Sequence, residues 1–325
     1  MTRRRTIRRH RRGPPAGPAV GFLLILILAG ALAPVLATDR PLAARTPDHR
    51  LVFPALADLP LAGRFFAGAG GTEVAEVLLS APVPYSFRGI RLEEALQPPG
   101  RRHLLGTDAL GRDLLARLVH GARPTLLIGL TATAAALLVG LSIGALAGLR
   151  GGIADVAVVR LADTVACFPA FVLALAFVAA AGGGGLLPLV AAIALNRWTG
   201  MARLTRGEIL RLKGGDMWNA ARAAGATGPR LVLRHLLPIL AAPIGVLGAF
   251  GVAHAIVLES SLSFVGFGLE PPIPSWGTLL SESRATLGAA WWPVAFPALG
   301  LLLTLASLCV LGDRMAGEET DRSGT

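Results

Sequence analysis

Few residues of this sequence have types and spacings suited to bond chemistry. The chain lacks G-x-x-x-x-G-K-[ST], the loop that cradles ATP phosphates, and it lacks H-E-x-x-H and G-x-S-x-G. The six histidines are scattered, and Cys167 and Cys309 form no C-x-x-C pair. We therefore expect no catalytic residue, no metal site, no cofactor and no ATP hydrolysis by the chain itself.

The remaining ionisable candidates lie in or next to apolar sequence. Arg160 and Asp163 are three residues apart on a predicted helix, and this spacing predicts an ion pair. Arg197 lies near the end of an apolar run, and its long side chain is expected to reach the water interface. For His254 and Glu259 two interpretations stay open: both line a transport pathway, or Glu259 caps a segment that re-enters the membrane.

The composition favours a membrane protein over a soluble one. Of the 325 residues, 53% are hydrophobic and 16% are charged, and the mean hydropathy is +0.61. Ala, Leu, Gly and Val supply most apolar residues, which suits packed helices better than a lipid-facing β-barrel. The net charge of +11 includes a basic cluster at residues 3–12. Because this cluster precedes an apolar run, we interpret it as a cytoplasmic anchor and not as a nucleic-acid site.

Six apolar runs are long enough to cross a bilayer, which takes about 20 residues. They predict spans at residues 18–37, 124–149, 153–181, 186–201, 236–258 and 292–312. The first is long for a signal peptide and is interpreted as an uncleaved helix. Four glycines at 182–185 predict the break between the third and fourth spans. The predicted fold is an all-α, polytopic membrane protein with six transmembrane helices.

The distribution of Lys and Arg in short loops predicts the orientation. Residues 203–236 are rich in Arg, whereas residues 259–291 contain only Arg284. Both termini and the 203–236 loop are therefore expected in the cytoplasm of a cell whose inner (plasma) membrane the chain crosses. The predicted divisions are a basic arm (1–17), a first helix (18–37), an extracytoplasmic segment (38–123), a five-helix core (124–312) and a cytoplasmic tail (313–325).

The extracytoplasmic segment is predicted to end in an amphipathic helix on the outer surface. Thr107 or Asp108 is suited to cap it. Its apolar face is expected to contain leucines and a valine, while three charged residues point away: Leu110, Leu114, Leu115, Leu118 and Val119 against Arg112, Asp113 and Arg117.

A glycine appears every four residues in the second span, at Gly140, Gly144 and Gly148. Such a stripe lets two helix backbones approach closely in lipid. We predict that the second span packs tightly against another helix through this stripe.

The 203–236 loop predicts a compact helix–turn–helix. Asp216 can cap a helix from Met217 to Ala224, and Gly225 supplies the left-handed conformation that ends it. Gly228-Pro229 opens a second short helix. Small side chains occupy one face of the first helix, with Met217 and Trp218 projecting. This helix is suited to docking in a cleft of a soluble partner, although composition alone also permits a plain membrane-surface loop.

This loop resembles the EAA loop of binding-protein-dependent ABC importer permeases. That pattern is E-A-A, three residues, Gly, nine residues, an apolar or His position, any residue, then Leu-Pro. The matching residues are Ala220, Ala221, Gly225, Leu237 and Pro238, with His235 as in peptide permeases. Asn219 replaces the usual Glu. The resemblance implies that the ATPase is contacted by Met217, Trp218, Asn219, Ala220, Ala221, Arg222 and Gly225.

Two further segments are similar to the C-type permeases of dipeptide, oligopeptide and nickel systems. One is L-G-T-D-A-L-G-R-D at 105–113, and the other runs from 259 to 277. Their signature positions are Gly106, Thr107, Asp108, Gly111, Arg112, Asp113, Glu259, Gly266 and Trp276. Together with the EAA loop, the resemblance extends from residue 105 to about residue 313, and residues 39–100 depart from it by their length.

The resemblance implies a type I ABC importer permease (MetI-like) fold. It also implies a heterodimer with a second permease subunit in membrane lipid, two cytoplasmic ATPase subunits and an extracytoplasmic substrate-binding protein. Peptides are the expected substrate, with nickel or another small solute as the alternative. A secondary transporter would show inverted repeats with broken helices, and an intramembrane enzyme would need a nucleophile or metal constellation.

Overall fold

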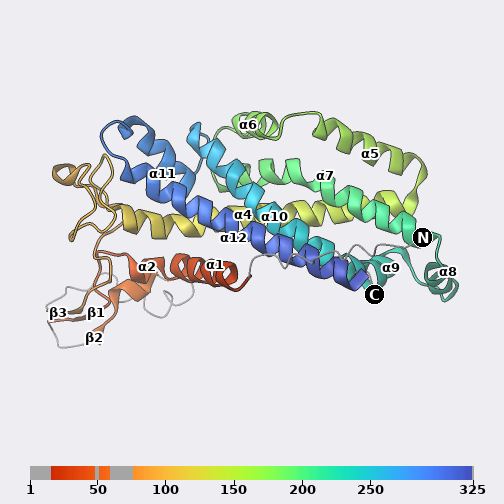
Figure 1. Ribbon diagram of the computed structural model, residues 1–325, viewed down its shortest axis with the longest axis horizontal. Coiled ribbons are helices and arrows are strands. Elements are labelled where there is room, and N and C mark those ends of the chain that lie inside the picture. Colours follow the sequence, from red (N-terminus) through yellow and green to blue (C-terminus); the bar gives the residue numbers. More distant parts are fainter. Residues whose placement is uncertain (1–15, 48–50, 59–75, 324–325) are drawn as a thin grey trace, which may run out of the picture.

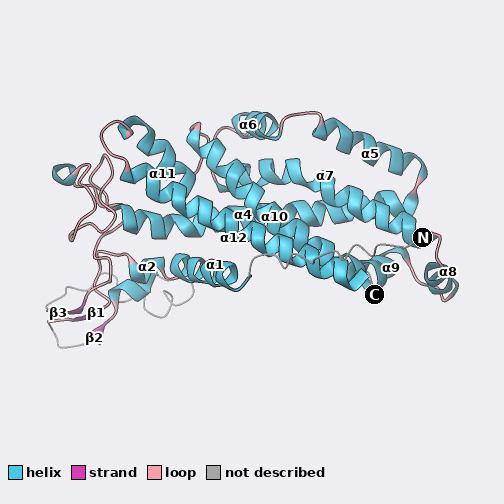
Figure 2. Ribbon diagram, viewed as in Figure 1, coloured by secondary structure: helices cyan, strands magenta, loops and turns pink. Residues whose placement is uncertain are grey.

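The computed structural model describes residues 16–47, 51–58 and 76–323, so most of the predicted basic arm lies outside the described residues. Within them the chain is mostly helical (Figure 2). The helices are α1 (Ala16–Ala31), α2 (Ala33–Leu36), α4 (Leu114–Arg150), α5 (Gly152–Ala166), α6 (Ala170–Ala180), α7 (Leu186–Lys213), α8 (Asp216–Ala223), α9 (Gly228–Leu231), α10 (Leu237–Phe264), α11 (Trp276–Ser283) and α12 (Trp292–Ser323). A π-helical turn, Val232–Leu236, joins α9 to α10.

A small antiparallel sheet lies within residues 39–100, the segment that departs from the family resemblance by its length. Its strands are β1 (Ala43–Arg45), β2 (Leu51–Val52) and β3 (Glu76–Leu79), in the order β2-β1-β3. Short 3₁₀ turns occur at Pro54–Asp58, Leu92–Glu94 and Arg284–Thr286. The helical bundle agrees with the predicted α class, and the sheet is an addition to it.

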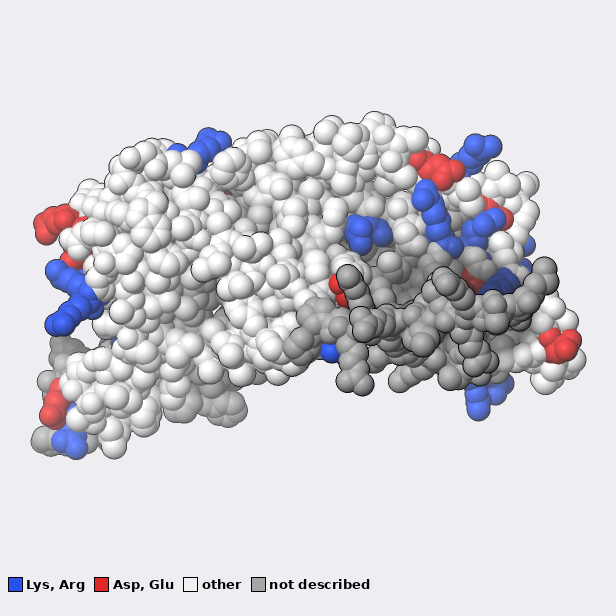
Figure 3. Space-filling model, in the orientation of Figure 1, with Lys and Arg blue, Asp and Glu red and all other residues white. Residues whose placement is uncertain are grey.

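The long helices α4, α7, α10 and α12 run along the long axis of the molecule (Figure 1). One end carries α8 and α9, and we call it the α8 end. The other carries α11 and the sheet, and we call it the α11 end. On the face shown in Figure 3, Lys and Arg side chains gather mainly toward these two ends, and much of the middle is uncharged. This distribution suits a protein whose middle lies in lipid.

Three described helices are long and apolar enough to cross a membrane: Leu114–Arg150, Leu237–Phe264 and Trp292–Gly317. The pair α5 and α6 would be a fourth span, but it is bent by 94°. The first predicted span corresponds to α1, which has 16 residues and is short for a crossing. The second half of α7 is charged. Length and composition thus support three or four spans, and the predicted count of six is not confirmed.

The predicted amphipathic surface helix is absent from the described residues, and this expectation was wrong. A single helix, α4, begins at Leu114 and continues through the second predicted span to Arg150. Asp113 caps it, since its carboxylate accepts a hydrogen bond from the Ala116 N–H at 2.8 Å. Arg117 is 2% exposed and does not point into solvent.

The third predicted span bends just before Pro169, between α5 and α6. Proline lacks an N–H and disfavours helical geometry in the residue before it, so the helix cannot continue smoothly. The predicted glycine break that follows is confirmed, because Gly182, Gly183 and Gly185 all have positive φ. The predicted Arg160–Asp163 pair was wrong. Asp163 pairs instead with Arg203 of α7, at 3.0 Å.

The glycine stripe of α4 lies directly against α7, which confirms the predicted close packing. A Cβ on Gly140 would lie 2.5 Å from the Trp198 carbonyl oxygen, and one on Gly144 would lie 2.4 Å from that of Ala202. A Cβ on Gly148 would lie 2.8 Å from the Ile209 Cβ. The two backbones therefore approach to a distance that only glycine permits, over residues 140–148 of α4 and 198–209 of α7.

We predict that Gly144→Ala destabilises the protein, because the added methyl overlaps the α7 backbone and overpacking costs about 1–3 kcal/mol. Gly207→Ala is the matched control: Gly207 lies in α7, and a Cβ added to it would have no atom within 4 Å, so alanine's better helix propensity should leave stability unchanged or raised. Thermal unfolding midpoints of the detergent-purified chain measure both effects. Equal midpoints for the two variants would contradict the packing described.

Candidate functional site

The α8 end of the molecule carries the helix–turn–helix that the sequence predicted. Helix α8 starts one residue earlier than expected, at Asp216, so Gly215 and not Asp216 occupies the N-cap position. Gly225 has φ +82°, and the Ala226 N–H donates to the Ala221 carbonyl at 3.0 Å. This is the left-handed helix end that the glycine predicted. The second short helix, α9, begins at Gly228 as expected.

The sequence predicted that Trp218 projects from α8. Its side chain instead packs against the bundle and anchors the helix. Its side chain is 3% exposed and packs in a cluster with Ile209 of α7 and Leu236 of the π-helical turn before α10. Ala221, three residues later, packs partly buried against the same cluster. The opposite face of α8 is exposed and includes Met217 (47% exposed), Asn219, Ala220 and Arg222. The helix therefore has one face packed on the bundle and one exposed face that mixes small, polar and apolar side chains.

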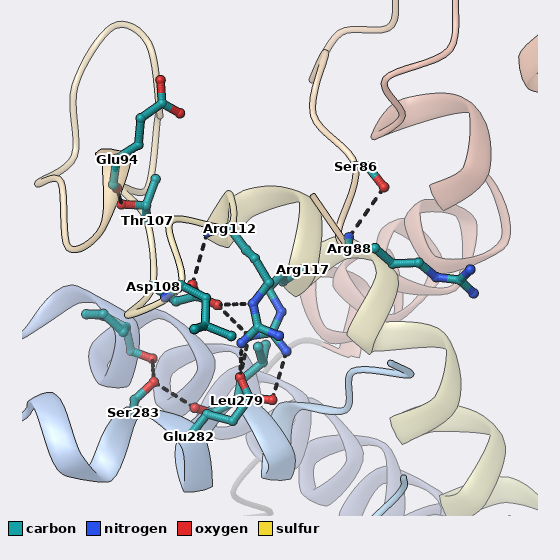
Figure 4. A network of polar contacts seen from close by, with 12 residues as sticks. Ser86, Arg88, Glu94, Thr107, Asp108, Arg112, Arg117, Leu279, Glu282 and Ser283 are labelled. Carbon is teal, nitrogen blue, oxygen red and sulfur yellow. Dashed lines mark hydrogen bonds and ion pairs between the residues drawn. The ribbon is translucent and has the colours of Figure 1, made fainter. Parts of the chain in front are cut away.

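At the α11 end, buried and partly buried charges join three segments of the chain (Figure 4). Asp108 accepts from the Arg112 Nε and the Arg117 Nη1, each at 2.7 Å. Arg117 also donates to both carboxylate oxygens of Glu282, at 2.6 and 3.1 Å, and Arg112 contacts Glu282 as well. Because Glu282 belongs to α11, these arginines tie the 105–113 loop and the start of α4 to that helix.

A second polar cluster lies behind this loop. His103 is buried, with its Nδ1 2.8 Å from an Asp113 carboxylate oxygen and its Nε2 3.3 Å from one of Glu94. Glu94 also pairs with Arg102 at 2.8 Å. Burial disfavours the charged carboxylate, but Arg102, Arg91 and His103 outweigh it and hold the pKa of Glu94 below its ordinary value. Glu94 and His103 were not predicted from sequence, since lone polar residues in a loop carry no periodic signal.

Both glycines of the 105–113 loop are required by its shape. Gly106 and Gly111 have φ of +80° and +70°. A Cβ on Gly111 would overlap the Arg91 carbonyl oxygen, 1.7 Å away. Thr107 donates its hydroxyl hydrogen to the Glu94 carbonyl and accepts from the Gln97 N–H at 2.8 Å. The L-G-T-D-A-L-G-R-D segment is thus a structural loop whose residues position one another.

Glu259 is fully buried at the α11 end of α10, where it accepts three hydroxyl hydrogen bonds. Ser263 and Ser275 donate at 2.7 Å and Ser260 at 3.3 Å. Ser275 is the N-cap of α11, and the Trp276 Nε1 donates to the Leu118 carbonyl of α4 at 2.9 Å. Ser275, and not Glu259, is therefore the cap, and Glu259 supports it by accepting the Ser275 hydroxyl hydrogen bond. The interpretation in which His254 and Glu259 line a transport pathway stays a prediction. Gly266, φ +99°, supplies the turn after α10.

Arg197 lies in the middle of α7 and not at its end, because α7 continues to Lys213. The prediction that it reaches the water interface was based on too short a helix. Its side chain lines a cavity of about 170 Å³ between three helices, with Asn196 of α7, Thr133 of α4 and Gly251 of α10. His254 of α10 lies one helical turn beyond Gly251. Across the described residues, no group of His, Cys, Asp or Glu is arranged to hold a metal ion.

Comparison with known families agrees with this arrangement of helices around the α8 loop. Residues 140–317, which include the glycine stripe, α8 and most of α12, match the family described as the inner membrane component of binding-protein-dependent transport systems. The chain belongs to this family. It is therefore a membrane permease component of an ABC transport system, and the family is that of the membrane subunit and not of the ATPase.

Similar curated proteins include three peptide-related permeases. The chain is 41% identical to the di/tripeptide transport system permease protein DppC of Pseudomonas aeruginosa, over 65% of this chain and 70% of that protein. It is 36% identical to the glutathione permease protein GsiD of Pectobacterium atrosepticum, over 66% and 71%. It is 34% identical to the oligopeptide permease protein OppC of Mycobacterium bovis, over 71% and 80%.

Among solved structures, a chain of the MetNI methionine ABC transporter in an inward-facing conformation has a similar fold. The TM-score is 0.51 at 20% sequence identity, and the match covers 62% of this chain and 95% of that one. This likeness supports the type I importer permease fold that the sequence resemblance implied.

We predict that acid loosens the loop around Glu94. Because the folded protein lowers the pKa of Glu94, its contribution to stability is present above the ordinary pKa of 4.5 and is lost as the pH falls through the folded value. Hydrogen exchange of the Gln97 and Thr107 amides, which bond within this loop, should accelerate below about pH 4.5 beyond the intrinsic pH effect. Glu94→Gln should remove this acid-dependent part, and an unchanged acid response in that variant would contradict the assignment.

We also predict that Arg117→Met destabilises the protein by about 3 kcal/mol, because it leaves the buried Asp108 carboxylate with one cation fewer. Arg101→Met, at an exposed position of the same segment, is the control and should change stability by less than about 0.5 kcal/mol. Unfolding of the purified chain in detergent measures both. Equal stability of the two variants would mean that the ion pairs of Arg117 contribute nothing to the free energy of unfolding.

Proposed function

We propose that this chain is one of two permease subunits of an ATP-driven peptide importer. It would form half of the translocation pathway, bind two cytoplasmic ATPase subunits at its α8 end and receive substrate from a binding protein at its α11 end. Membership of the family supports the permease role. The relatives named for di- and tripeptides, glutathione and oligopeptides favour a peptide substrate over nickel, since all three names denote amide-linked chains.

The observation that carries the coupling role is the two-faced packing of α8. Trp218 and Ala221 face the bundle, while Met217, Asn219 and Ala220 face outward. The exposed face combines the small Asn219 and Ala220 with the projecting Met217, and such a face suits insertion in a cleft of a partner. Asn219, which replaces the usual glutamate, retains hydrogen-bonding capacity at this face.

For the topology we propose six crossings, with both termini and the α8 end in the cytoplasm. Besides the three long helices and the bent pair α5–α6, the crossings would be made by α1 with α2 and by α7. The apolar sequence of α1 and α2 extends to Ala37, which gives 22 residues from Ala16. The concentration of Arg between residues 203 and 234 supports the cytoplasmic assignment of the α8 end.

In the proposed mechanism, closure of the ATPases on ATP displaces α8. Since Trp218 packs against Ile209 and Leu236, that displacement is passed to α7 and α10 together. These two helices and α4 enclose the cavity that Arg197 lines, so their movement would switch access from the inward to the outward side. This chain contributes no bond chemistry to the cycle; hydrolysis belongs to the partner subunits.

We predict that Ala220→Asp abolishes peptide uptake and weakens co-purification of the ATPase subunits, because it places an uncompensated charge in the partner contact. Ala220 is exposed in the chain alone, so membrane insertion should be normal. Ala221→Asp is a poorer test, since it also disturbs the Trp218 cluster. Asn219→Glu, which restores the usual family residue, is the control and should be tolerated.

Gly225→Val tests the turn that ends α8. Its φ of +82° is unfavourable for a β-branched residue by about 1–2 kcal/mol, although no atom lies within 4 Å of the added Cβ. We expect misdirection of α8 and loss of uptake with normal expression in membranes. Normal uptake and normal ATPase recovery in both Ala220→Asp and Gly225→Val would show that α8 is not the coupling element.

A further inference from the structure

A cation lies at mid-depth in the apolar part of the bundle. The cavity around Arg197 is lined by Thr133 and Ala136 near the centre of the apolar run of α4, and by Leu247 and Gly251 near the centre of α10. Gly140 of α4 lies against the carbonyl of Trp198, the residue after Arg197, so Arg197 lies at the same depth as the centre of α4. A charged side chain at this depth is costly unless it faces a polar cavity or a partner.

No carboxylate pairs with Arg197 among the residues that the structure describes. Its polar neighbours in the cavity are Asn196, Thr133 and Thr199, all uncharged. His254, one helical turn beyond Gly251 on α10, is a side chain that is never anionic. Within the described part of the chain, the guanidinium therefore lies in a cavity whose lining combines three uncharged polar side chains with apolar and glycine residues and includes no carboxylate.

We propose that Arg197 binds the α-carboxylate of the transported peptide midway along the pathway. The proposal rests on the proposed function and names the part of the substrate that this chain recognises. A guanidinium pairs with a carboxylate through two parallel N–H···O bonds, which selects a planar anion over a neutral amide. Asn196 donates one N–H to the Ala192 carbonyl at 2.9 Å and retains a second N–H and its carbonyl oxygen. These groups are suited to the last peptide bond of the substrate.

The site is large enough to bind one end of a passing peptide but too small to enclose the whole molecule. A volume of about 170 Å³ takes the carboxylate end of a peptide but not a whole one, so the rest would extend into the space shared with the second permease subunit. Because the cavity walls belong to α4, α7 and α10, and α7 and α10 carry the Trp218 anchor, movement of α8 would open or compress the site. The peptide anion would then be released on the inward side.

The test is uptake by cells that express the complete transporter, with Ala-Ala and its C-terminal amide as paired substrates. The selectivity of the binding protein for one of these peptides is the same in every strain. Its effect therefore cancels when the ratio of Ala-Ala uptake to amide uptake in a variant is divided by the same ratio in the wild type. Arg197→Gln should lower uptake of Ala-Ala by about tenfold to a hundredfold, as expected for loss of a charge-assisted hydrogen bond. Uptake of the amide should change little, so the ratio falls.

Two further variants separate recognition from structure. Arg197→Lys keeps the charge and should recover part of the ratio, while Arg160→Gln removes an exposed arginine of α5 and should leave the ratio at its wild-type value. An equal loss of both substrates in Arg197→Gln, or an unchanged ratio, would overturn the carboxylate assignment and indicate a structural charge or one paired with the second permease. Absence of any peptide uptake in the wild type would instead refute the proposed function.

Discussion

The contact between α4 and α7 determines most of what this chain can do. Gly140, Gly144 and Gly148 let the two backbones meet where any larger side chain would collide. Lipid provides no hydrophobic driving force between helices, so close packing of this kind is what holds them together. Because α7 is fixed along much of its length, its two functional positions are fixed as well: Arg197 in the middle and the α8 loop at its end.

The α8 loop then depends on that fixed helix at its base. Lys213, the last residue of α7, donates to the Leu149 carbonyl at the end of α4, at 2.8 Å. Trp218 packs against α7 and α10 only a few residues later. A force applied to the exposed face of α8 therefore meets a rigid attachment and is passed to the helices around the central cavity. At the α11 end, Arg117 and Glu259 perform the corresponding task by binding α11 to α4 and α10.

The features that the sequence predicted well are those in which glycine or proline leaves one backbone solution. The stripe in α4, the break at 182–185 and the turn at Gly225 all belong to this class. Which side chains are buried was harder to predict from the sequence. Asp113, and not Thr107 or Asp108, caps α4, because the latter two bond within the loop. The burial of Trp218 could not be predicted from local sequence, because the cluster that it joins is built from three separate segments of the chain. Long-range pairs such as Asp163 with Arg203 and Arg117 with Glu282 leave no mark in local spacing.

Coupling through α8 is tested most directly by a cross-link from its exposed face. In a chain whose Cys167 and Cys309 are replaced by serine, Met217→Cys places one thiol on that face, and Gly207→Cys serves as a control further back on α7. In membranes containing the complete transporter, we expect a short bifunctional maleimide to join position 217, but not 207, to an ATPase subunit, with a yield that changes on addition of ATP. Labelling of position 217 by a membrane-impermeant maleimide from outside intact cells, with no cross-link to the ATPase, would contradict it.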